Sequence, residues 1–300
     1  MPFLTIFTSA KPFNRNPHVD MIQRNAVQSW KHLGADVDVY MVGKEPGLAE
    51  VTEELGVQHI SDVLCNELGT PYIDSMFDLV RQRSSAPYLC YSNADIIFLP
   101  DFLEAAHQVA SLVKDFLIFG RRWDVDIDQP INYDPGWDQT LMDLVNEKGV
   151  LHGPVGSDFF LYPRHLLTDM LHFSIGRSGW DNWTIFHGLK SGWDVIDISR
   201  SATVIHQNHD YSHLPDGKPP YKLPETKKNI VLAGGMKNMY TTLEANKVLI
   251  NGQIKPTSLS IPRLLHWLEL KVTNDDLKGL RKNVVRWLKR SRRRYEHELI

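Results

Sequence analysis

Short apolar runs alternate with stretches of helical hydrophobic periodicity through the first 120 residues, and this alternation constrains the fold most strongly. Apolar, β-branched runs predict strands over residues 3–8, 37–42, 57–60, 88–91 and 116–119. Apolar residues at helical spacing predict helices over residues 19–33, 48–55, 75–83 and 102–113. Because strands that alternate with helices build βαβ units, we expect an α/β fold whose mainly parallel sheet is flanked by helices.

The pattern becomes less regular after residue 120, and fewer elements can be predicted there. Asp101 and Glu104 form a capping-box variant at the start of the helix over 102–113. The segment 121–137 is rich in Asp, Pro and Trp, which indicates an ordered surface loop able to bind a ligand. Residues 156–163 (GSDFFLYP) predict a further strand, and 181–189 a helix that begins at Asp181.

Charge is distributed unevenly along the chain. Residues 277–300 carry nine Lys/Arg and two Asp/Glu, a net +7, which leaves 24 basic and 34 acidic residues, a net −10, in the remainder. An acidic body argues against nucleic-acid binding. A Gly- and Pro-containing stretch over 251–262 predicts a boundary between a body at 1–250 and a helical, basic extension at 251–300.

Location is predicted from the cysteines and the first residues. Two cysteines exclude a Cys-rich metal site and favour a reducing, cytoplasmic compartment. The segment MPFLTIFTSAKPF resembles a strand more than a secretory signal, and no apolar stretch approaches the ~18–20 residues that span a bilayer.

Polar residues follow the predicted strands, where ligands of parallel sheets bind. Thr8, Ser9 and Lys11 follow the first strand and Glu45 the second, while Asp74 precedes the helix over 75–83. Their hydroxyl, ammonium and carboxylate groups suit a nucleotide base and ribose, although each also fits a solvated loop. The absence of a Gly-x-Gly-x-x-Gly or Walker motif removes the main support for dinucleotide oxidoreductases and P-loop proteins.

The stretch YLCYSNADIIF (88–98) is the most informative of the chain. Its buried apolar strand breaks into Asn93, Ala94 and Asp95 and then becomes apolar again. Polar side chains in such a run are costly unless they find strong partners. Two oxygen ligands here can hold a hard divalent cation that bridges the phosphates of a nucleotide. The alternative is a strand-end turn in which both side chains bond nearby backbone N–H groups.

This stretch resembles the metal-binding region of nucleotide-sugar glycosyltransferases with the GT-A fold, in which a buried strand ends in Asp-X-Asp. The resemblance covers roughly residues 2–210 and includes the first strand and loop, GSDFFLYP and the GWDNW helix start. It implies a Rossmann-like GT-A sheet, a nucleotide-diphosphate sugar donor, and Mn²⁺ or Mg²⁺ on Asn93 and Asp95. Asn93 departs from the pattern, since it replaces the first Asp.

The resemblance also implies roles for later residues. Asp181 matches the acidic residue that takes the proton from an acceptor hydroxyl in inverting enzymes, although it also suits a simple helix cap. His206 matches the histidine that completes the cation site, and His209 and Asp210 are expected to line the donor or acceptor pocket. We expect no role for His213, the last histidine of the cluster.

Two further side chains are candidates for the site. Asp158 is the second candidate, after Asp181, for the catalytic carboxylate, and it suits hydrogen bonds to sugar hydroxyls, with a buried pair to Arg164 as the alternative. Arg177 can neutralise a diphosphate, although a solvated arginine fits as well.

The acceptor is expected to be a glycan or a lipid-linked molecule. Apolar residues at helical spacing in 277–300, surrounded by Lys and Arg, predict a basic amphipathic helix that contacts an anionic membrane surface or packs on the acidic body. Two alternatives keep this fold. One is a sugar-phosphate nucleotidyltransferase, which the glycine-free loop SAKPFNRN disfavours. The other is a non-catalytic carbohydrate-binding scaffold with a decayed metal site.

Overall fold

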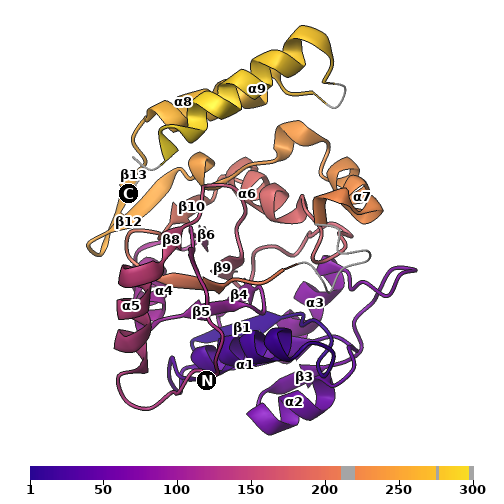
Figure 1. The fold of residues 1–300 in the computed structure, drawn as a ribbon, viewed down its shortest axis with the longest axis vertical. Coiled ribbons are helices and arrows are strands. Elements are labelled where there is room, and N and C mark those ends of the chain that lie inside the picture. Colours follow the sequence, from indigo (N-terminus) through magenta and orange to yellow (C-terminus); the bar gives the residue numbers. More distant parts are fainter. Residues whose placement is uncertain (211–219, 275–276, 297–300) are drawn as a thin grey trace.

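A nine-stranded sheet forms the centre of the molecule in the computed structural model, which describes residues 1–210, 220–274 and 277–296 (Figure 1). The strand order across this sheet is β13-β12-β10-β6-β9-β4-β1-β2-β3. In this order, the first four strands are β13 (Gln253–Pro256), β12 (Lys247–Ile250), β10 (Asp194–Asp197) and β6 (Phe116–Phe119). The others are β9 (Phe159–Pro163), β4 (Tyr88–Ser92), β1 (Leu4–Thr8), β2 (Val37–Val42) and β3 (Gln58–Ile60).

Most neighbours in this sheet run parallel. Strand β1 pairs in parallel with β2 and β4, and β10 does so with β6 and β12. Strand β9, the predicted GSDFFLYP strand, instead runs antiparallel to both β4 and β6. The predicted α/β class with a mainly parallel sheet is therefore confirmed.

Five helices correspond to those that the periodicity predicts. They are α1 (Pro17–Lys31), α2 (Leu48–Leu55), α3 (Ile73–Arg83), α4 (Pro100–Leu112) and α6 (Trp180–Lys190). Two more, α5 (Trp137–Lys148) and α7 (Pro224–Leu232), were not predicted. The capping box expected at Asp101 is wrong, because the N-cap of α4 is Leu99 and Asp101 lies inside the helix. The Oδ2 of Asp101 instead accepts a hydrogen bond from the Thr203 N–H at 2.8 Å.

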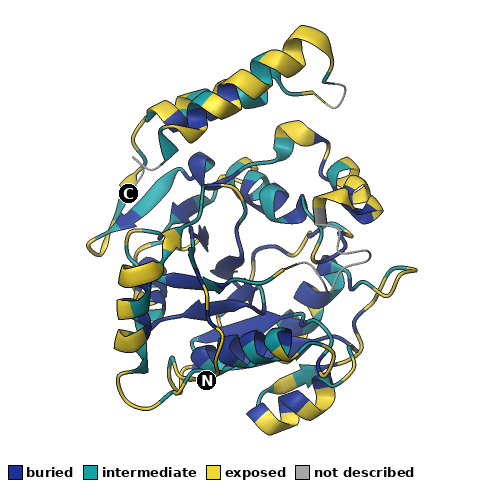
Figure 2. Ribbon diagram, in the orientation of Figure 1, coloured by how far each residue is buried: buried dark blue, intermediate teal, exposed yellow. Residues whose placement is uncertain are grey.

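Both faces of the sheet are buried, which explains why its strands are continuous apolar runs (Figure 2). On β1, Ile6 packs in one core cluster with Trp30 of α1, while its neighbour Phe7 packs in another with Phe77 of α3. Alternate residues of one strand point to opposite faces, so each apolar run contributes to both clusters. The polar residues at the strand ends are thereby held on a rigid base.

A smaller sheet lies next to the first and has the order β5-β11-β7-β8. Its strands are β5 (Ile96–Phe98), β11 (Val204–Gln207), β7 (Trp123–Val125) and β8 (Val150–Leu151). Strand β7 lies inside segment 121–137, so the expectation of a loop throughout that segment is wrong. The register pairs His206 with Ile96 on one side and with Asp124 on the other.

The C-terminal part begins with a hairpin and ends with a helical pair. Strands β12 and β13 pair antiparallel at the edge of the main sheet, so the boundary expected at residue 250 falls within this hairpin. Helices α8 (Ile261–Val272) and α9 (Gly279–Arg293) then lie along one another at one end of the molecule (Figure 1). None of the helices in the described ranges has the length and apolar character that crossing a bilayer requires.

Candidate functional site

A cavity of about 540 Å³ opens where strands β1 and β4 end. The predicted site residues that line it are Ser9, Lys11, Glu45, Asn93, Ala94, Asp95, Asp158, Arg177 and His206. His209 lines it too, as expected, together with Arg122 and Tyr91. Side chains from distant parts of the sequence therefore meet at the sheet edge where ligands of parallel sheets bind.

Asn93 bonds to two side chains of the cavity wall. Its Oδ1 accepts from the Tyr91 hydroxyl at 2.7 Å, and its Nδ2 donates to Asp158 Oδ1 at 2.8 Å. Among the carboxylates and imidazoles, Asp95, His206 and His209 are positioned to share a cation. Asn93 thus holds Asp158 in the cavity wall, and its role as a metal ligand stays a prediction.

Asp158 is bonded to a different arginine from the one expected. Its Oδ2 accepts from the guanidinium of Arg122, whereas Arg164 donates to the backbone carbonyls of Arg81 and Ala86. The alternative that pairs Asp158 with Arg164 is wrong. Nearby carboxylates raise the pKa of the Arg122 guanidinium against the effect of its burial, so this arginine stays charged.

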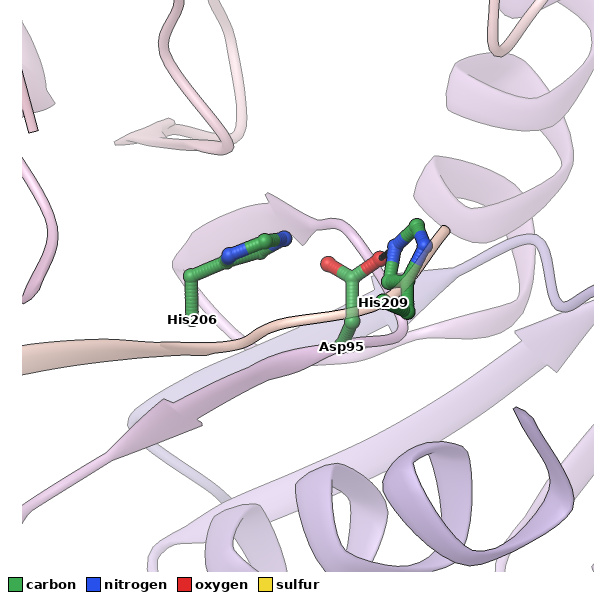
Figure 3. A group of neighbouring side chains, drawn as sticks. All are labelled: Asp95, His206 and His209. Carbon is green, nitrogen blue, oxygen red and sulfur yellow. Dashed lines mark hydrogen bonds and ion pairs between the residues drawn. The ribbon is translucent and has the colours of Figure 1, made fainter. Parts of the chain in front are cut away.

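Asp95, the last residue of the link from β4 to β5, lies between two histidines (Figure 3). Its Oδ2 lies 3.0 Å from His209 Nε2 and 3.4 Å from Lys11 Nζ. The other oxygen, Oδ1, is buried without a hydrogen-bond partner among the described residues, and the ring of His206 points toward it (Figure 3). The ligand atoms of Asp95, His206 and His209 all lie within 4.8 Å of one another. An orphaned carboxylate oxygen beside imidazole nitrogens fits a divalent cation.

Charge keeps Asp95 ionised in this setting. Burial alone raises the pKa of a carboxyl, but the Lys11 ammonium, the bond to His209 and the nearby His206 hold the pKa of Asp95 well below its usual range. The Lys11 ammonium also lies 3.1 Å from His209 Nε2. A carboxylate, two imidazoles and an ammonium thus face one end of the cavity.

A second carboxylate, Asp124, lies behind His206. Its Oδ1 is 3.0 Å from His206 Nδ1 and 2.9 Å from Arg122 Nε, and its Oδ2 is 2.7 Å from His152 Nδ1. Sequence reasoning marked the surrounding segment as able to bind a ligand but did not single out Asp124, Arg122 or His152. Their meeting depends on the register of β7 with β11, which no local pattern indicates.

The residues expected on the nucleotide side separate into two groups. Ser9, Lys11 and Glu45 line the cavity, and burial raises the pKa of the Glu45 carboxyl. Thr8 and Asp74 are not among the lining residues. Thr8 is fully buried at the end of β1, and Asp74 Oδ2 lies 2.8 Å from His172 Nδ1.

Arg177 is held at the cavity wall by a carboxylate on α7. Its Nε donates to Glu225 Oε2 at 2.6 Å, and the side chains of Arg177 and Glu225 are only 12% and 4% exposed. The other oxygen of Glu225 accepts from Asn66 at 2.6 Å and from Thr70 at 2.8 Å. Arg177 is therefore a fixed part of the site and not a solvated surface residue.

Asp181 is the second residue of α6, whose N-cap is Gly179. It therefore does not occupy the cap position expected for it, although its Oδ1 accepts from the Gly179 N–H at 3.1 Å. Protein surrounds most of this carboxyl, and burial raises its pKa to about 6, with Asp158 adding in the same direction. Asp181 is not among the residues that line the cavity of Asp95.

A second cavity, of about 250 Å³, lies on the other side of the turn before α6. Ile175, Gly176 and Arg177 line the first cavity, while Ser178 and Gly179 line the second. The second cavity extends beneath α8 and α9, and its remaining wall is largely apolar, including Val155, Tyr221, Ile230, Met236, Met239 and Leu270. The turn that precedes Asp181 is therefore the partition between the two cavities.

No protein-family model matches the chain, and no curated protein matches it by sequence. Its structure is similar to a mannosyltransferase from Pyrobaculum calidifontis solved with GDP-Man and Mn²⁺, at 11% identity and a TM-score of 0.43, over 71% of this chain and 59% of that one. It is also similar to S. aureus TarS (10%, TM-score 0.49, 92% of this chain and 44% of that one). A third similar structure is glucosyl-3-phosphoglycerate synthase from Mycobacterium tuberculosis (13%, TM-score 0.44, 69% and 72%). At such identities the likeness concerns the fold alone.

Proposed function

We propose that the chain is a GT-A-type glycosyltransferase that moves a sugar from a nucleotide-diphosphate donor to a hydroxyl of a glycan or lipid-linked acceptor. The observation that carries this proposal is the buried Asp95 carboxylate, which faces His206, His209 and Lys11 in a cavity at the ends of β1 and β4. A cavity of about 540 Å³ accommodates a ligand of small-molecule size.

Asp95, His206 and His209 would hold Mn²⁺ or Mg²⁺. The residues fit such an ion, because Asp95 Oδ1 is buried without a partner among the described residues and because carboxylate and imidazole groups both ligate Mn²⁺. When bound, the cation supplies positive charge that stabilises the departing diphosphate. Asp124 orients His206 from behind, since a carboxylate on Nδ1 leaves Nε2 free to ligate.

The remaining donor contacts are assigned to side chains of the same cavity. Lys11 and Arg177 place two cations on its walls, where they would neutralise the phosphates. Ser9 and Glu45 offer a hydroxyl and a carboxylate to the nucleoside, and Asp158 offers its carboxylate to the hydroxyls of the transferred sugar. This arrangement would orient the anomeric carbon toward the turn that precedes α6.

Asp181 acts as the general base in this proposal. A carboxyl with a pKa near 6 is ionised at neutral pH and still basic enough to accept a proton in the transition state. It would take the proton of the acceptor hydroxyl while that oxygen bonds to the anomeric carbon and the bond to the diphosphate breaks. Attack opposite the leaving group inverts the anomeric configuration.

The acceptor is assigned to the second cavity, because Ser178, Gly179 and Asn182 line it beside Asp181. Its largely apolar wall favours an acceptor with an apolar part, such as a lipid-linked glycan. The enzyme would then work in the cytoplasm, with residues 277–300 against an anionic membrane surface.

Donor binding and nucleotide release test the proposal. Isothermal titration with a panel of nucleotide sugars, with and without Mn²⁺, should give a Kd for at least one donor, and that donor should release its nucleotide diphosphate when acceptor is present. Binding without release under any condition would favour a scaffold. Release of pyrophosphate from a sugar phosphate and a nucleoside triphosphate would favour a nucleotidyltransferase.

A further inference from the structure

The pair of helices α8 and α9 packs on the body through one face only. On α8, His266 is 4% exposed, and its Nδ1 lies 2.6 Å from Glu244 Oε1. On α9, Leu288 and Arg292 are 4% and 1% exposed. Of the apolar residues expected to pack on the acidic body, only Leu288 is buried among those described.

The opposite side of the pair, here called the outer face, exposes large apolar side chains. They are Ile261, Leu264, Trp267 and Leu268 on α8 and Leu280 and Trp287 on α9. Leu280 is 79% exposed, Trp287 63% and Trp267 53%. The exposed character of this pair contrasts with the buried sheet below it (Figure 2). Apolar side chains grouped in this way on two helices mark a contact surface.

Exposed cations accompany these apolar side chains on the same pair of helices. They are Lys271, Lys278, Arg281, Lys282, Arg286, Arg290, Arg293 and Arg294, whereas Lys289 is exposed but lines the second cavity. Of the acidic residues described in this pair, Glu269 lies 3.2 Å from Arg292 Nε, and Glu296 accepts from the same guanidinium. The buried Arg292 thus takes up both carboxylates, and the exposed charge is strongly positive.

Two alternative partners fit this face poorly. A nucleic acid would explain the cations but would leave Leu264, Leu268 and Leu280 in water. A second copy of the chain would cover these residues but would bring two positive surfaces together. An anionic bilayer surface satisfies both features, because Trp and Leu enter the boundary between headgroups and acyl chains while Lys and Arg contact the phosphates.

We propose that the outer face of α8 and α9 docks on an anionic lipid surface, with Trp267 and Trp287 at the level of the headgroups. Lys271 Nζ already lies 5.6 Å from the centre of the Trp267 ring, so a cation and an aromatic ring occupy the same edge of the face. The proposed docking depends on this face alone. The second cavity lies beneath the same helices, so docking would bring a lipid-linked acceptor toward it, and this last step rests on the proposed function.

Co-sedimentation of the full chain with vesicles tests the docking. The protein should pellet with vesicles of phosphatidylcholine mixed with phosphatidylglycerol and stay in the supernatant with pure phosphatidylcholine, and its binding should weaken as NaCl is raised. Arg286→Ser combined with Arg290→Ser should lower the partition coefficient by about 30-fold, since each cation near an anionic surface adds about fivefold. Trp267→Ala combined with Trp287→Ala should lower it several-fold on the same vesicles.

Matched substitutions on the body separate this surface from general effects. Leu112→Ala, at the last residue of α4, removes an exposed apolar side chain, and Lys114→Ser, just beyond α4, removes an exposed cation. Both variants should bind vesicles like the wild type. Melting temperature and gel filtration should be unchanged in all variants. Equal binding to both vesicle types, wild-type binding by both double variants, or a dimer that these substitutions dissociate would overturn the proposal. Because no donor is present, failure here leaves the donor-binding test of glycosyl transfer unaffected.

Discussion

Asp124 Oδ1 lies 3.0 Å from His206 Nδ1, and the parallel register of β7 with β11 sets these two residues side by side. His206 is thus placed between two carboxylates. Asp124 lies at its Nδ1, and the ring points toward the unpartnered Oδ1 of Asp95 (Figure 3). Burial raises the pKa of a carboxyl, but the hydrogen bond with His152, the close contact with His206 and the charge of Arg122 hold the pKa of Asp124 well below its usual range. A permanent anion behind Nδ1 favours the tautomer whose Nε2 can bind a cation.

Replacing Asp124 should therefore weaken metal binding without removing a ligand. We expect Asp124→Asn to lower the affinity for Mn²⁺ by about 10- to 100-fold, the range seen when the partner of a ligating histidine is lost. Titration calorimetry with Mn²⁺ alone measures the change. Asp128→Asn, at an exposed carboxylate of the same segment, should bind Mn²⁺ like the wild type. If Asp124→Asn and Asp128→Asn bound Mn²⁺ with equal affinity, Asp124 would have no role in positioning His206.

Removing Asp95 should abolish stabilisation by metal. In the wild type, Mn²⁺ at about 100 times its Kd should add about 2.7 kcal/mol to the free energy of unfolding, and EDTA should reverse the gain. In Asp95→Asn, the melting temperature should not respond to Mn²⁺, because the orphaned oxygen and its charge are lost. Glu104→Gln, at an exposed site on α4, should respond normally. A full Mn²⁺ response in Asp95→Asn would place the metal elsewhere.

The rate of transfer should depend on pH through Asp181. Burial raises the pKa of this carboxyl to about 6, and Asp158 is the charged neighbour that adds to the shift. A general base must be ionised, so kcat/KM should be low below this pKa, rise as the pH passes about 6 and then level off. Initial rates measured from pH 5 to pH 8 at saturating donor, after correction for protein unfolding, give the profile. A flat profile over this range would exclude Asp181 as the base.

The effect of Asp181→Asn on the free energy of unfolding distinguishes two roles for Asp181, a general base and a residue that only stabilises the start of a helix. The chain supplies a matched control, since α5 begins with Gly136, Trp137 and Asp138 as α6 begins with Gly179, Trp180 and Asp181. A raised pKa means that Asp181 stabilises the fold below its unfolded pKa and loses that contribution as the pH rises through about 6. At pH 7 Asp181→Asn should therefore raise the free energy of unfolding by about 1–3 kcal/mol.

Activity and stability should then change in opposite directions. Asp181→Asn should bind donor normally and lower kcat by about 10²- to 10⁴-fold. Asp138→Asn should leave activity intact and leave stability unchanged or slightly reduced, since a carboxylate in the first turn of a helix is favourable. Thermal unfolding and single-turnover transfer measure the two effects. A stabilised but fully active Asp181→Asn enzyme, or a destabilised one, would argue against the assigned role.

Filling the second cavity should affect acceptor binding alone. Met239→Trp places a larger side chain in its wall and should raise the KM for acceptor several-fold, with the Kd for donor unchanged. Leu232→Trp, at an exposed residue that does not line the cavity, serves as the control. Donor and acceptor constants that change together in Met239→Trp would contradict a separate acceptor site.

Local pattern was sufficient to predict six of the nine strands of the main sheet, though not β10, β12 and β13, and to identify Asp95 just beyond the end of β4. An apolar run interrupted by a carboxylate identified both β4 and Asp95, because burying such a group requires a strong partner. The reversed direction of β9 was not predictable, since an apolar strand has the same composition in either direction. Strand β7 of the small sheet was missed because it is only three residues long and lies among loop-forming residues.

The side-chain partners that the sequence did not reveal have a common physical cause. Asn93 has the residue type and the position of a ligand, but its amide also bonds to Tyr91 and Asp158, and only the pairing of β4 with β9 brings Asp158 there. Asp74 lies at the start of a helix as predicted, yet its carboxylate is bonded to His172, 98 residues away in the sequence. Sequence spacing predicts which side chains lie near a strand end, whereas the partner of each side chain depends on tertiary contacts.

Glu225 gives α7 a function beyond its own packing. This one carboxylate binds Arg177, Asn66 and Thr70, and α7 itself contributes no residue to the lining of the first cavity. Displacement of the helix would withdraw a guanidinium from the wall while the central sheet stayed in place. The position of α7 and the affinity of the first cavity for an anion are therefore coupled. A ligand that binds the Arg177 guanidinium must in turn stabilise α7 against the body.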